Sequence, residues 1–217
     1  GTYKSINNAS SWTNSQLDVK VYNMDLDNAN PSILYLANYT GGIYKTTNST
    51  SSWSPVGLSD EMMYTVAVNQ LRHTQIFAGT VGNGIFRSDD SASHWVHSEQ
   101  GLFNTNVTAM LTVPWDTNRL YSATTHNGVS LSTDKGVTWT LMNNGLSDHT
   151  VNDLVINPLD DTQLIAISES GGIFKCALPG CIWTTSNSGL PTEISPKNIE
   201  VTGLLDEIQK LELFLMG

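Results

Sequence analysis

The sequence is short of positive charge. Its 10 Lys and Arg residues are outnumbered by 20 Asp and Glu residues, which gives a formal net charge of −10. Binding to the phosphate backbone of a nucleic acid requires clustered basic side chains that displace counterions. The composition therefore argues against a nucleic-acid-binding protein.

Long apolar runs and helix-forming segments are also scarce. No stretch of 18 apolar residues occurs, so the sequence predicts no membrane-spanning helix. Charged residues make up only 14% of the chain, whereas Ser, Thr, Asn and Gly are abundant, a composition typical of strands joined by many turns. At 217 residues the chain is long enough for one domain with a sizeable core, and we expect a single all-β domain.

Cysteine occurs only twice, at Cys176 and Cys181 in KCALPGCIW, where Pro179 and Gly180 turn the chain. This spacing suits a disulfide across a short loop. Two free thiols, or half of a zinc site, are the alternatives, although structural zinc needs four ligands. A disulfide favours an extracellular or periplasmic location. The sequence predicts neither a metal site nor a cofactor.

Tryptophan, in contrast, recurs with a fixed period. Five of the six Trp residues are separated by 41, 42, 44 and 44 positions. A period of 40 to 50 residues is typical of a β-propeller, in which each repeat forms one four-stranded blade. The periodic residues are Trp12, Trp53, Trp95, Trp139 and Trp183.

The octapeptide that ends in each of these Trp residues is itself repeated, most completely as STDKGVTW. Ser or Thr, Asp or Asn, and Gly supply the chemistry of a tight turn, because the polar side chains accept hydrogen bonds from their own loop. We therefore interpret the octapeptide as a structural clasp between the third and fourth strands, with no catalytic role. Its structural residues are Ser5, Asn7, Trp12, Asn48, Trp53, Ser88, Asp90, Trp95, Ser132, Asp134, Gly136, Trp139 and Trp183.

A Gly followed by an apolar strand precedes each clasp, and two further runs of β-forming residues precede that strand, so each unit contains four strands. Residues 1–4 align with residues 42–45, which places the start of the chain in the middle of a unit. We expect a closed, five-bladed propeller of four-stranded antiparallel blades, in which N- and C-terminal strands share one blade. The units are about residues 1–17 plus 198–217, 18–57, 58–101, 102–145 and 146–197.

The predicted closure of the ring depends on the C-terminal tail. We expect strands near residues 199–205 and 211–216, and a closed ring would have no exposed sheet edge. The alternative is a terminal helix, because apolar residues also recur at helical spacing, at Leu204, Ile208, Leu211 and Leu215. A helix would leave the fifth blade incomplete, and the chain would then need a partner or a larger parent protein to cover the gap.

With these repeats the chain resembles the Asp-box (BNR-like) repeat β-propellers. That group includes sialidases, xyloglucanase-type glycoside hydrolases, sortilin-like receptors and photosystem II assembly factors. The resemblance implies the propeller architecture and leaves the activity open, because function depends on the site and not on the repeat. A sialidase would need three converging arginines, and the three present are spread over a third strand and two turns, at Arg87, Arg72 and Arg119.

Propellers bind ligands mostly at the face formed by the loops that join the second strand to the third and one blade to the next. We expect ligand-binding residues there at Asn38, Tyr39, Asn83, His126, Asn127, His149 and Glu169. Two imidazoles and a carboxylate, from His126, His149 and Glu169, leave a metal or acid–base set open. A glycosidase pair could come from the acidic loop residues Asp60, Glu61, Asp148 and Glu169.

The segment DLDNANP, residues 25–31, carries oxygen ligands at alternate positions. It lacks the Gly and the distant Glu of the known calcium loop, so we expect an ordinary turn. The sequence as a whole favours a recognition or scaffold propeller without catalytic residues, which binds a protein or a glycan at its loop-rich face. The alternative is a glycoside hydrolase related to the xyloglucanase-type propellers, and a third possibility is a part of a larger propeller protein.

Overall fold

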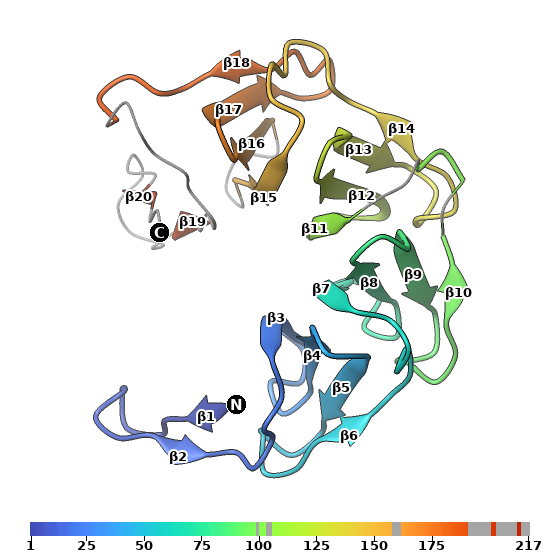
Figure 1. The fold of residues 1–217 in the computed structure, drawn as a ribbon, viewed down its shortest axis with the longest axis vertical. Coiled ribbons are helices and arrows are strands. Elements are labelled where there is room, and N and C mark those ends of the chain that lie inside the picture. The colour runs from blue at the N-terminus through green and yellow to red at the C-terminus, as the bar shows by residue number, and fades with distance from the viewer. Residues whose placement is uncertain (99, 103–105, 158–161, 191–200, 203–211, 214–217) are drawn as a thin grey trace.

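The structure, a computed structural model, describes residues 1–98, 100–102, 106–157, 162–190, 201–202 and 212–213. Within this part of the chain the fold is all-β, as predicted, and four four-stranded antiparallel sheets follow one another around an arc (Figure 1). In each sheet the four strands are ordered as they are in the sequence. Each sheet therefore has the construction of a propeller blade.

The first two of these blades contain β3 (Val21–Leu26), β4 (Leu34–Asn38), β5 (Ile43–Thr46) and β6 (Ser54–Pro55), then β7 (Met63–Val68), β8 (Ile76–Thr80), β9 (Ile85–Ser88) and β10 (Val96–His97). The next two contain β11 (Val107–Val113), β12 (Asp116–Thr124), β13 (Gly128–Ser132) and β14 (Thr140–Leu141), then β15 (Val151–Ile156), β16 (Gln163–Ser168), β17 (Gly172–Ala177) and β18 (Thr184–Thr185). The first strand of each blade lies innermost in the arc, and the short fourth strand lies outermost (Figure 1).

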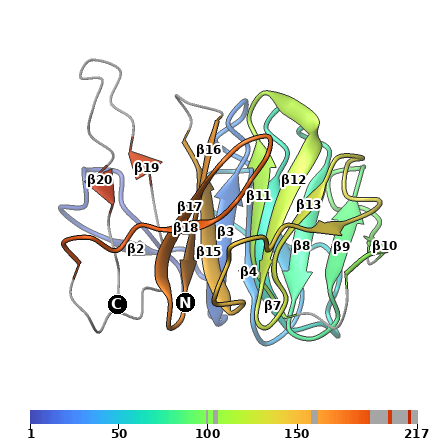
Figure 2. The same cartoon turned by 90° about the horizontal axis from the view of Figure 1, so that it is seen from above.

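The hydrophobic core is divided among the interfaces between neighbouring blades. Tyr35 and Ile43 of the first blade pack with Val66 and Ile76 of the second in one cluster. Two further clusters join the second blade to the third and the third to the fourth. Because fully burying one such side chain contributes about 1.5–3 kcal/mol, each blade depends on its neighbours for its stability. The strands run between two loop-bearing faces of the molecule (Figure 2).

The repeated octapeptide forms a hydrogen-bonded clasp between the third and fourth strands. In the third blade, Ser132 Oγ donates to Asp134 Oδ1 at 2.8 Å and accepts from Gly136 N at 2.8 Å, and Thr138 N donates to Asp134 Oδ1 at 2.8 Å. The same three bonds occur in the copies that begin at Ser5, Thr46 and Ser88. The polar side chains of the motif are thus used to hold their own turn.

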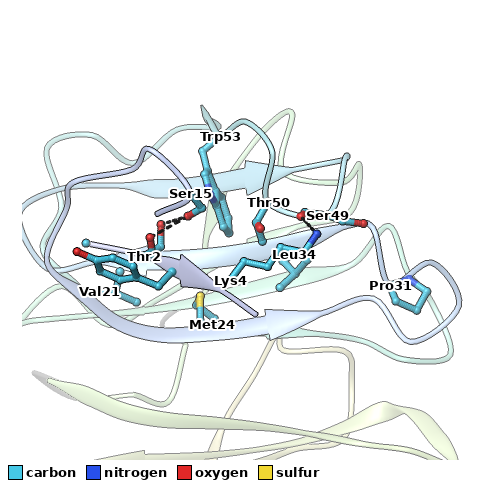
Figure 3. A pocket seen from close by; sticks show the side chains of 12 residues that line it. Thr2, Lys4, Ser15, Val21, Met24, Pro31, Leu34, Ser49, Thr50 and Trp53 are labelled. Atoms are coloured by element: carbon cyan, nitrogen blue, oxygen red, sulfur yellow. Dashed lines mark hydrogen bonds between the residues drawn. The ribbon is translucent and has the colours of Figure 1, made fainter. Parts of the chain in front are cut away.

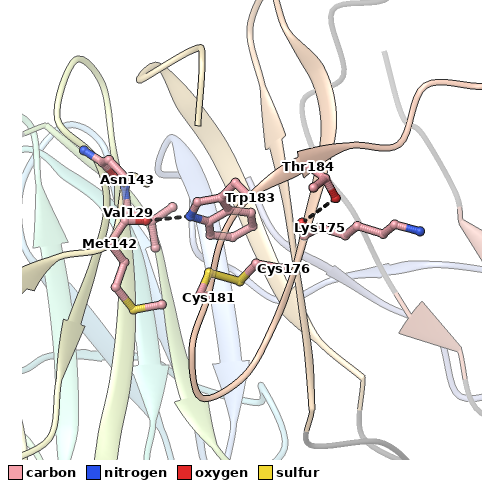
Figure 4. Close-up of a disulfide and its surroundings, with 8 residues drawn as sticks. All are labelled: Val129, Met142, Asn143, Lys175, Cys176, Cys181, Trp183 and Thr184. Atoms are coloured by element: carbon pink, nitrogen blue, oxygen red, sulfur yellow. Dashed lines mark hydrogen bonds between the residues drawn. A yellow bond between two sulfur atoms is a disulfide. The ribbon is translucent and has the colours of Figure 1, made fainter. Parts of the chain in front are cut away.

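The fourth blade holds the same turn with a covalent bond. Cys176 occupies the position of the clasp serine, seven residues before Trp183, and it forms a disulfide with Cys181 (Figure 4). The loop carries a cis peptide bond between Leu178 and Pro179. A disulfide in the place of a Ser–Asp pair keeps the third and fourth strands together by a different kind of bond.

The periodic tryptophans of the four blades occupy equivalent places, each directly before the fourth strand of its blade, and Trp12 stands directly before β2. The indole nitrogen of Trp95 donates to the carbonyl oxygen of Val56 at 2.8 Å, and that of Trp183 donates to Met142 O at 2.5 Å. Trp139 Nε1 donates to Ser98 Oγ at 3.2 Å. Each acceptor lies in the preceding blade, three residues after that blade's own Trp, so these residues join consecutive blades.

Ring closure is not shown. At the N-terminus, β1 (Tyr3–Lys4) pairs with β2 (Thr13–Asn14), and at the C-terminus β19 (Val201–Thr202) pairs with β20 (Glu212–Leu213). These are two separate two-stranded sheets, whereas the sequence predicts one shared blade. In the described part of the tail the structure has strands and no helix, and residues 203–211 and 214–217 lie outside the described residues.

Candidate functional site: a cavity on the inner strands

Each of the four innermost strands has a β-bulge at the same place. The pairing register shifts after the first residue, between Val21 and Asn23 in β3, and at the equivalent step in β7, β11 and β15. A bulge leaves one residue out of the ladder and redirects its side chain, a device common beside binding sites. The four bulged residues are Tyr22, Tyr64, Thr108 and Asn152.

All four bulged residues line one cavity of about 420 Å³ at the loop-rich face of the arc. The rest of the wall comes from neighbouring positions on the inner strands and from the loop residues Thr125, Thr150 and Glu169. The charged side chains among these lining residues are Asp153 and Glu169. The buried hydroxyl oxygen of Thr125 has no hydrogen-bond partner within the described residues, so it is available to a ligand or to water.

Three tyrosines form an aromatic cluster at one side of this cavity. The rings of Tyr22 and Tyr39 are stacked with centroids 4.5 Å apart, and Tyr64 meets Tyr22 edge-on at 5.3 Å. The ammonium group of Lys20 lies 4.3 Å from the centroid of Tyr39 and 5.3 Å from that of Tyr22. Burial raises the pKa of Tyr64, and the nearby Tyr39 and Tyr22 add to the effect, so its ring is presented as a neutral phenol.

Polar bonds between neighbouring inner strands hold the cavity in shape. Asn23 Oδ1 accepts from Val66 N at 3.1 Å, and Thr108 Oγ1 donates to Val151 O at 2.5 Å. Deeper along β3, Asp25 accepts from the backbone N–H groups of Val68 and Leu26, both at 2.8 Å. Burial raises the pKa of Asp25 to about 6, and these two backbone bonds lower it only in part.

The predicted ligand residues are spread unevenly around this site. Glu169 lines the cavity, and Tyr39 stacks on Tyr22 at its edge. Asn38 is buried, and its amide binds its own turn, with Nδ2 donating to Gly41 O and Oδ1 accepting from Thr40 N. Asn83 lies farther out, where its amide donates to Glu61 Oε1 at 2.7 Å.

The two predicted histidines lie on exposed loops outside the cavity wall. His126 has a left-handed backbone with φ of 83°, and the carbonyl oxygen of His149 accepts from Gly128 N. The backbone carbonyl oxygen of Asn127 accepts a hydrogen bond from the side-chain amide of Asn143. No group of three His, Cys, Asp or Glu residues within the described part of the chain is close enough to hold a metal ion. His126, His149 and Glu169 therefore do not form the metal set that the sequence left open.

Two of the four acidic loop residues are engaged in holding the loops. Asp148 accepts from Thr150 N, Ser170 N, Ser170 Oγ and Gly171 N, at 2.7–3.0 Å. Burial alone would raise the pKa of Asp148, but these bonds outweigh it and lower the pKa to about 2. Glu61 accepts from the Asn83 amide. Asp148 therefore stays ionised and anchors a loop. A carboxylate that holds no proton cannot serve as a general acid.

The segment at residues 25–31 forms an ordinary turn. Asp27 Oδ1 accepts from Ala29 N at 2.9 Å and from Asn30 N at 3.2 Å, and the carboxylate also contacts His73 Nδ1 at 2.8 Å. Its oxygens are used inside the protein, in agreement with the prediction from the missing Gly and Glu.

A second hollow, an apolar groove of about 380 Å³, lies between β1–β2 and the first blade (Figure 3). Met24 in this groove is 50% exposed, whereas Val66, at the same position of the second blade, is 2% exposed. Trp53 Nε1 is buried without a hydrogen-bond partner within the described residues, although Trp95, Trp139 and Trp183 all have one. We interpret this groove as the face of the first blade on which a preceding blade would pack, and β1 and β2 cover only part of that face.

Sequence reasoning missed most of the cavity wall, including Tyr22, Tyr64, Thr108 and Asp153. The sequence holds a weak signal for this wall. The second residue of each inner strand is polar or aromatic, although the alternation of apolar and polar residues along the strand would allow any residue there. The bulge that turns these residues toward the axis is not visible in a sequence pattern.

The fold is similar to solved structures of known proteins. An ancestral GH74 enzyme aligns with a TM-score of 0.73 at 19% identity, over 87% of this chain and 28% of the enzyme. YCF48 from Cyanidioschyzon merolae aligns at 0.59 and 15% identity, over 82% of this chain and 61% of that protein. U3-55K aligns at 0.62 and 12% identity, over 77% of this chain and 52% of that protein.

These similarities confirm the resemblance to the Asp-box propellers in fold, and at such low identities they show the fold alone. The chain spans between about a quarter and three fifths of the length of these proteins. No family model and no curated protein matches the sequence. One of the three proteins is named as an enzyme and two are not, so the fold leaves the activity open. The described residues contain no helix long and apolar enough to cross a bilayer.

Proposed function

We propose that this protein is a non-catalytic recognition module that binds a protein segment or a glycan at the axial mouth. The observation that carries the proposal is the cavity of about 420 Å³ built from the four bulged residues Tyr22, Tyr64, Thr108 and Asn152. Repetition of one bulge in four strands concentrates adaptable polar and aromatic side chains at a single point. Concave sites with a few convergent polar groups are typical of ligand-binding pockets in proteins.

Ligands for the test come from a glycan array and a random-peptide display library. Tyr22→Ala should weaken binding of a selected ligand about tenfold, because a lost aromatic contact is worth about 0.5–1.5 kcal/mol. Tyr3→Ala is the matched control, since Tyr3 is an exposed tyrosine that lines the apolar groove and not the cavity. Binding that depends on Tyr3 and not on Tyr22 would contradict the proposal.

The alternative, a glycoside hydrolase of the xyloglucanase type, has one observation in its favour. Asp153 and Glu169 are two carboxylates in the wall of the same cavity, and glycoside hydrolysis uses such a pair. Incubation with xyloglucan and cello-oligosaccharides, followed by detection of reducing ends, separates the two functions. We expect no release of reducing ends, and release that Glu169→Gln abolishes would establish the hydrolase instead.

We also propose that the fold is completed to five blades, with β19–β20 as the inner strands of the blade whose outer strands are β1–β2. The uncovered Met24, the apolar groove and the unpartnered Trp53 Nε1 support the proposal, because an additional pair of strands would cover this face. The order of the strands along the chain also agrees with such a blade, because its inner strands would come from the C-terminal end of the chain and its outer strands from the N-terminal end. A blade so completed needs no partner and exposes no sheet edge.

Trp12 tests the closure. It is 61% exposed in the structure, and a closed ring would bury it against the fourth blade as Trp183 is buried against the third. Trp12→Ala should then lower the free energy of unfolding by more than about 2 kcal/mol. Trp115, an exposed Trp outside the periodic series, is the control, and Trp115→Ala should cost less than about 1 kcal/mol. Equal, small costs for both variants would contradict closure.

A further inference from the structure

The fourth blade carries, on the side that faces away from the third blade, the groups that hold a clasp elsewhere in the arc. We infer that this side is a docking surface for the clasp at residues 5–12 of the N-terminal sheet. Its central contact is a hydrogen bond from the Lys175 ammonium to the carbonyl oxygen of Asn8. The inference rests on the proposed closure to five blades and names the contacts by which the fourth blade recognises the fifth.

A basic residue on the third strand of a blade reaches the clasp of the next blade. Three such bonds occur: Lys4 Nζ to Ser49 O at 2.7 Å, Lys45 Nζ to Ser91 O at 3.2 Å, and Arg87 Nη1 to Lys135 O at 3.1 Å. Each acceptor is the third residue after the Ser or Thr that opens its clasp. One bond from a cation to a backbone carbonyl therefore joins each of these neighbouring pairs, including β1–β2 and the first blade.

The third blade lacks this cation, and the turn that it meets is not an Asp-box clasp. Leu131 occupies the position, and it packs with Met142 against the cluster that contains Cys176. The fourth blade closes this turn with the disulfide between Cys176 and Cys181, which is apolar. The residue on the third strand thus matches the turn of the next blade, a cation for a hydrogen-bonded clasp and an aliphatic side chain for the disulfide.

The fourth blade has the residue type that matches a hydrogen-bonded clasp. Lys175 on β17 occupies the position of Lys45 and Arg87. Its side chain is exposed and points away from the disulfide and from Trp183 (Figure 4). The ammonium group has no hydrogen bond or ion pair within the described residues. A cation at this position therefore stands ready for a clasp that would follow the fourth blade.

Ser186 adds a second matching group on the same blade. It lies three residues after Trp183, the position that Ser98 has in the second blade. The Ser98 hydroxyl donates to the carbonyl oxygen of Gly136 in the next clasp and accepts from the indole of Trp139 at 3.2 Å. Ser186 is therefore placed to accept from the Trp of a following clasp.

The clasp at residues 5–12 is the described clasp that still lacks these contacts. The equivalent carbonyl oxygens of the other three accept from Lys4, Lys45 and Arg87. Within the described residues no group donates to Asn8 O, and Trp12 is 61% exposed. In a repeat protein each unit is stabilised by contacts with its neighbours. The unused donor of the last blade and the unused acceptor of the first clasp are thus complementary.

The first test is chemical cross-linking with a short amine-reactive reagent. In the inferred assembly Lys175 lies beside Lys4 as Lys4 lies beside Lys45, so the Lys4–Lys45 link is the internal reference. Equal amounts of isotope-labelled and unlabelled protein are mixed, and mass spectrometry of the peptides separates links within one copy from links between copies. We expect a Lys175–Lys4 link within one copy.

A link only between labelled and unlabelled copies would mean that a second copy occupies the surface, and it would overturn the inference. Absence of the Lys175–Lys4 link from a sample that yields the Lys4–Lys45 link would overturn it as well.

The second test compares substitutions of the cation by urea unfolding. Lys175→Met should raise the ratio of unfolded to folded protein about tenfold, because a hydrogen bond from a charged donor is lost. Lys175→Arg should change this ratio less than about twofold, since Arg87 makes the same bond in the second blade. Lys45→Met, which removes a bond of the same kind, is the reference. A large effect of Lys45→Met with none of Lys175→Met would contradict the inference.

The Trp12 variant separates the inference from the closure on which it rests. If Trp12→Ala is strongly destabilising while Lys175→Met is neutral and the cross-link is absent, the closure stands and the inference is wrong. If Trp12→Ala is neutral as well, the closure fails with it.

Discussion

The two ends of the arc bear the same sequence motif in different surroundings. In the third and fourth blades Trp139 and Trp183 are 4% and 2% exposed, and each indole N–H is bonded to the blade before it. At the N-terminal end Trp12 is 61% exposed, and Trp53 Nε1 has no partner within the described residues. The difference teaches that a repeat specifies the position of its Trp, while the preceding blade decides whether that Trp is buried.

The same contrast is visible along the inner strands. Val68 and Ile156 are buried in the second and fourth blades, whereas Leu26, at their position in the first blade, is 38% exposed. Each blade buries one face against its predecessor, so a blade without a complete predecessor keeps apolar surface in contact with water. Four predictions, ordered from the largest expected effect to the smallest, test this comparison.

Trp183→Ala should have the largest effect at the covered end. The side chain is almost fully buried in the cluster that joins the third and fourth blades, and truncation of a buried Trp costs about 3–5 kcal/mol. Urea unfolding, followed by circular dichroism, measures this cost. A cost below about 1 kcal/mol would mean that the interface between the blades does not contribute to stability as the structure indicates.

The disulfide clasp of the fourth blade should contribute more to the free energy of unfolding than the hydrogen-bonded clasp of the first blade. Replacing both Cys176 and Cys181 with Ser should lower the free energy of unfolding by about 2 kcal/mol, from the restored freedom of a short loop. Asn48→Ala removes the side-chain oxygen that accepts hydrogen bonds from Ser52 N and Thr46 Oγ1. This change should lower the free energy of unfolding by about 1 kcal/mol. Thermal or urea unfolding of the two variants gives the comparison, which an equal or reversed order would contradict.

Asp25 should make the first blade sensitive to pH. Its pKa in the folded protein is about 6, above the ordinary value of 3.8, so the folded state binds the proton more tightly than the unfolded state. The resulting contribution to stability is complete below pH 4 and is lost as the pH rises through 6. Asp25→Asn should remove this dependence, and near pH 7 it should be more stable than the parent by about 1–2 kcal/mol.

The measurement is urea unfolding of the parent and of Asp25→Asn between pH 4 and pH 7. The difference between the two curves isolates Asp25, because all other groups titrate in both proteins. Parallel curves across this range would contradict the raised pKa.

The smallest effect should come from the clasp turn itself. Thr50 has a left-handed backbone with φ of 69° and a buried hydroxyl without a partner within the described residues, whereas the equivalent Gly136 adopts φ of 75° without a side chain. Thr50→Gly should stabilise the protein by about 0.5–1 kcal/mol, because it relieves this strain. The reverse change, Gly136→Thr, should destabilise it, since a Cβ there would lie 2.7 Å from Phe77 Cε1.

Much of the architecture could be predicted from local patterns. The spacing of the Trp residues and the strand alternation placed four blades in the correct order, because both depend on the chain within one repeat. The clasp residues Ser132 and Asp134 bond only within their own turn, and Cys176 and Cys181 are only five residues apart. Such short-range chemistry is visible in the sequence.

The candidate site was predicted less well. Glu169 and Tyr39 were found because they lie at loop tips, but Tyr22 and Tyr64 belong to strands of different blades and meet at 5.3 Å only after the blades pack. Asn38 and Asn83 were chosen for their loop positions, and their amides are bonded to Gly41 and Glu61. Loop position indicates exposure, but it does not show which way a side chain points.

By itself the sequence determined the repeat, the four-stranded blade and the turn chemistry of each clasp, since these depend on residues close together in the chain. The tertiary structure alone decided how the inner strands bulge toward the axis, which tyrosines form a cluster beside two carboxylates, and how far each Trp is buried. The physical reason is that burial and side-chain direction depend on the neighbouring blade, which lies about 40 residues away along the chain.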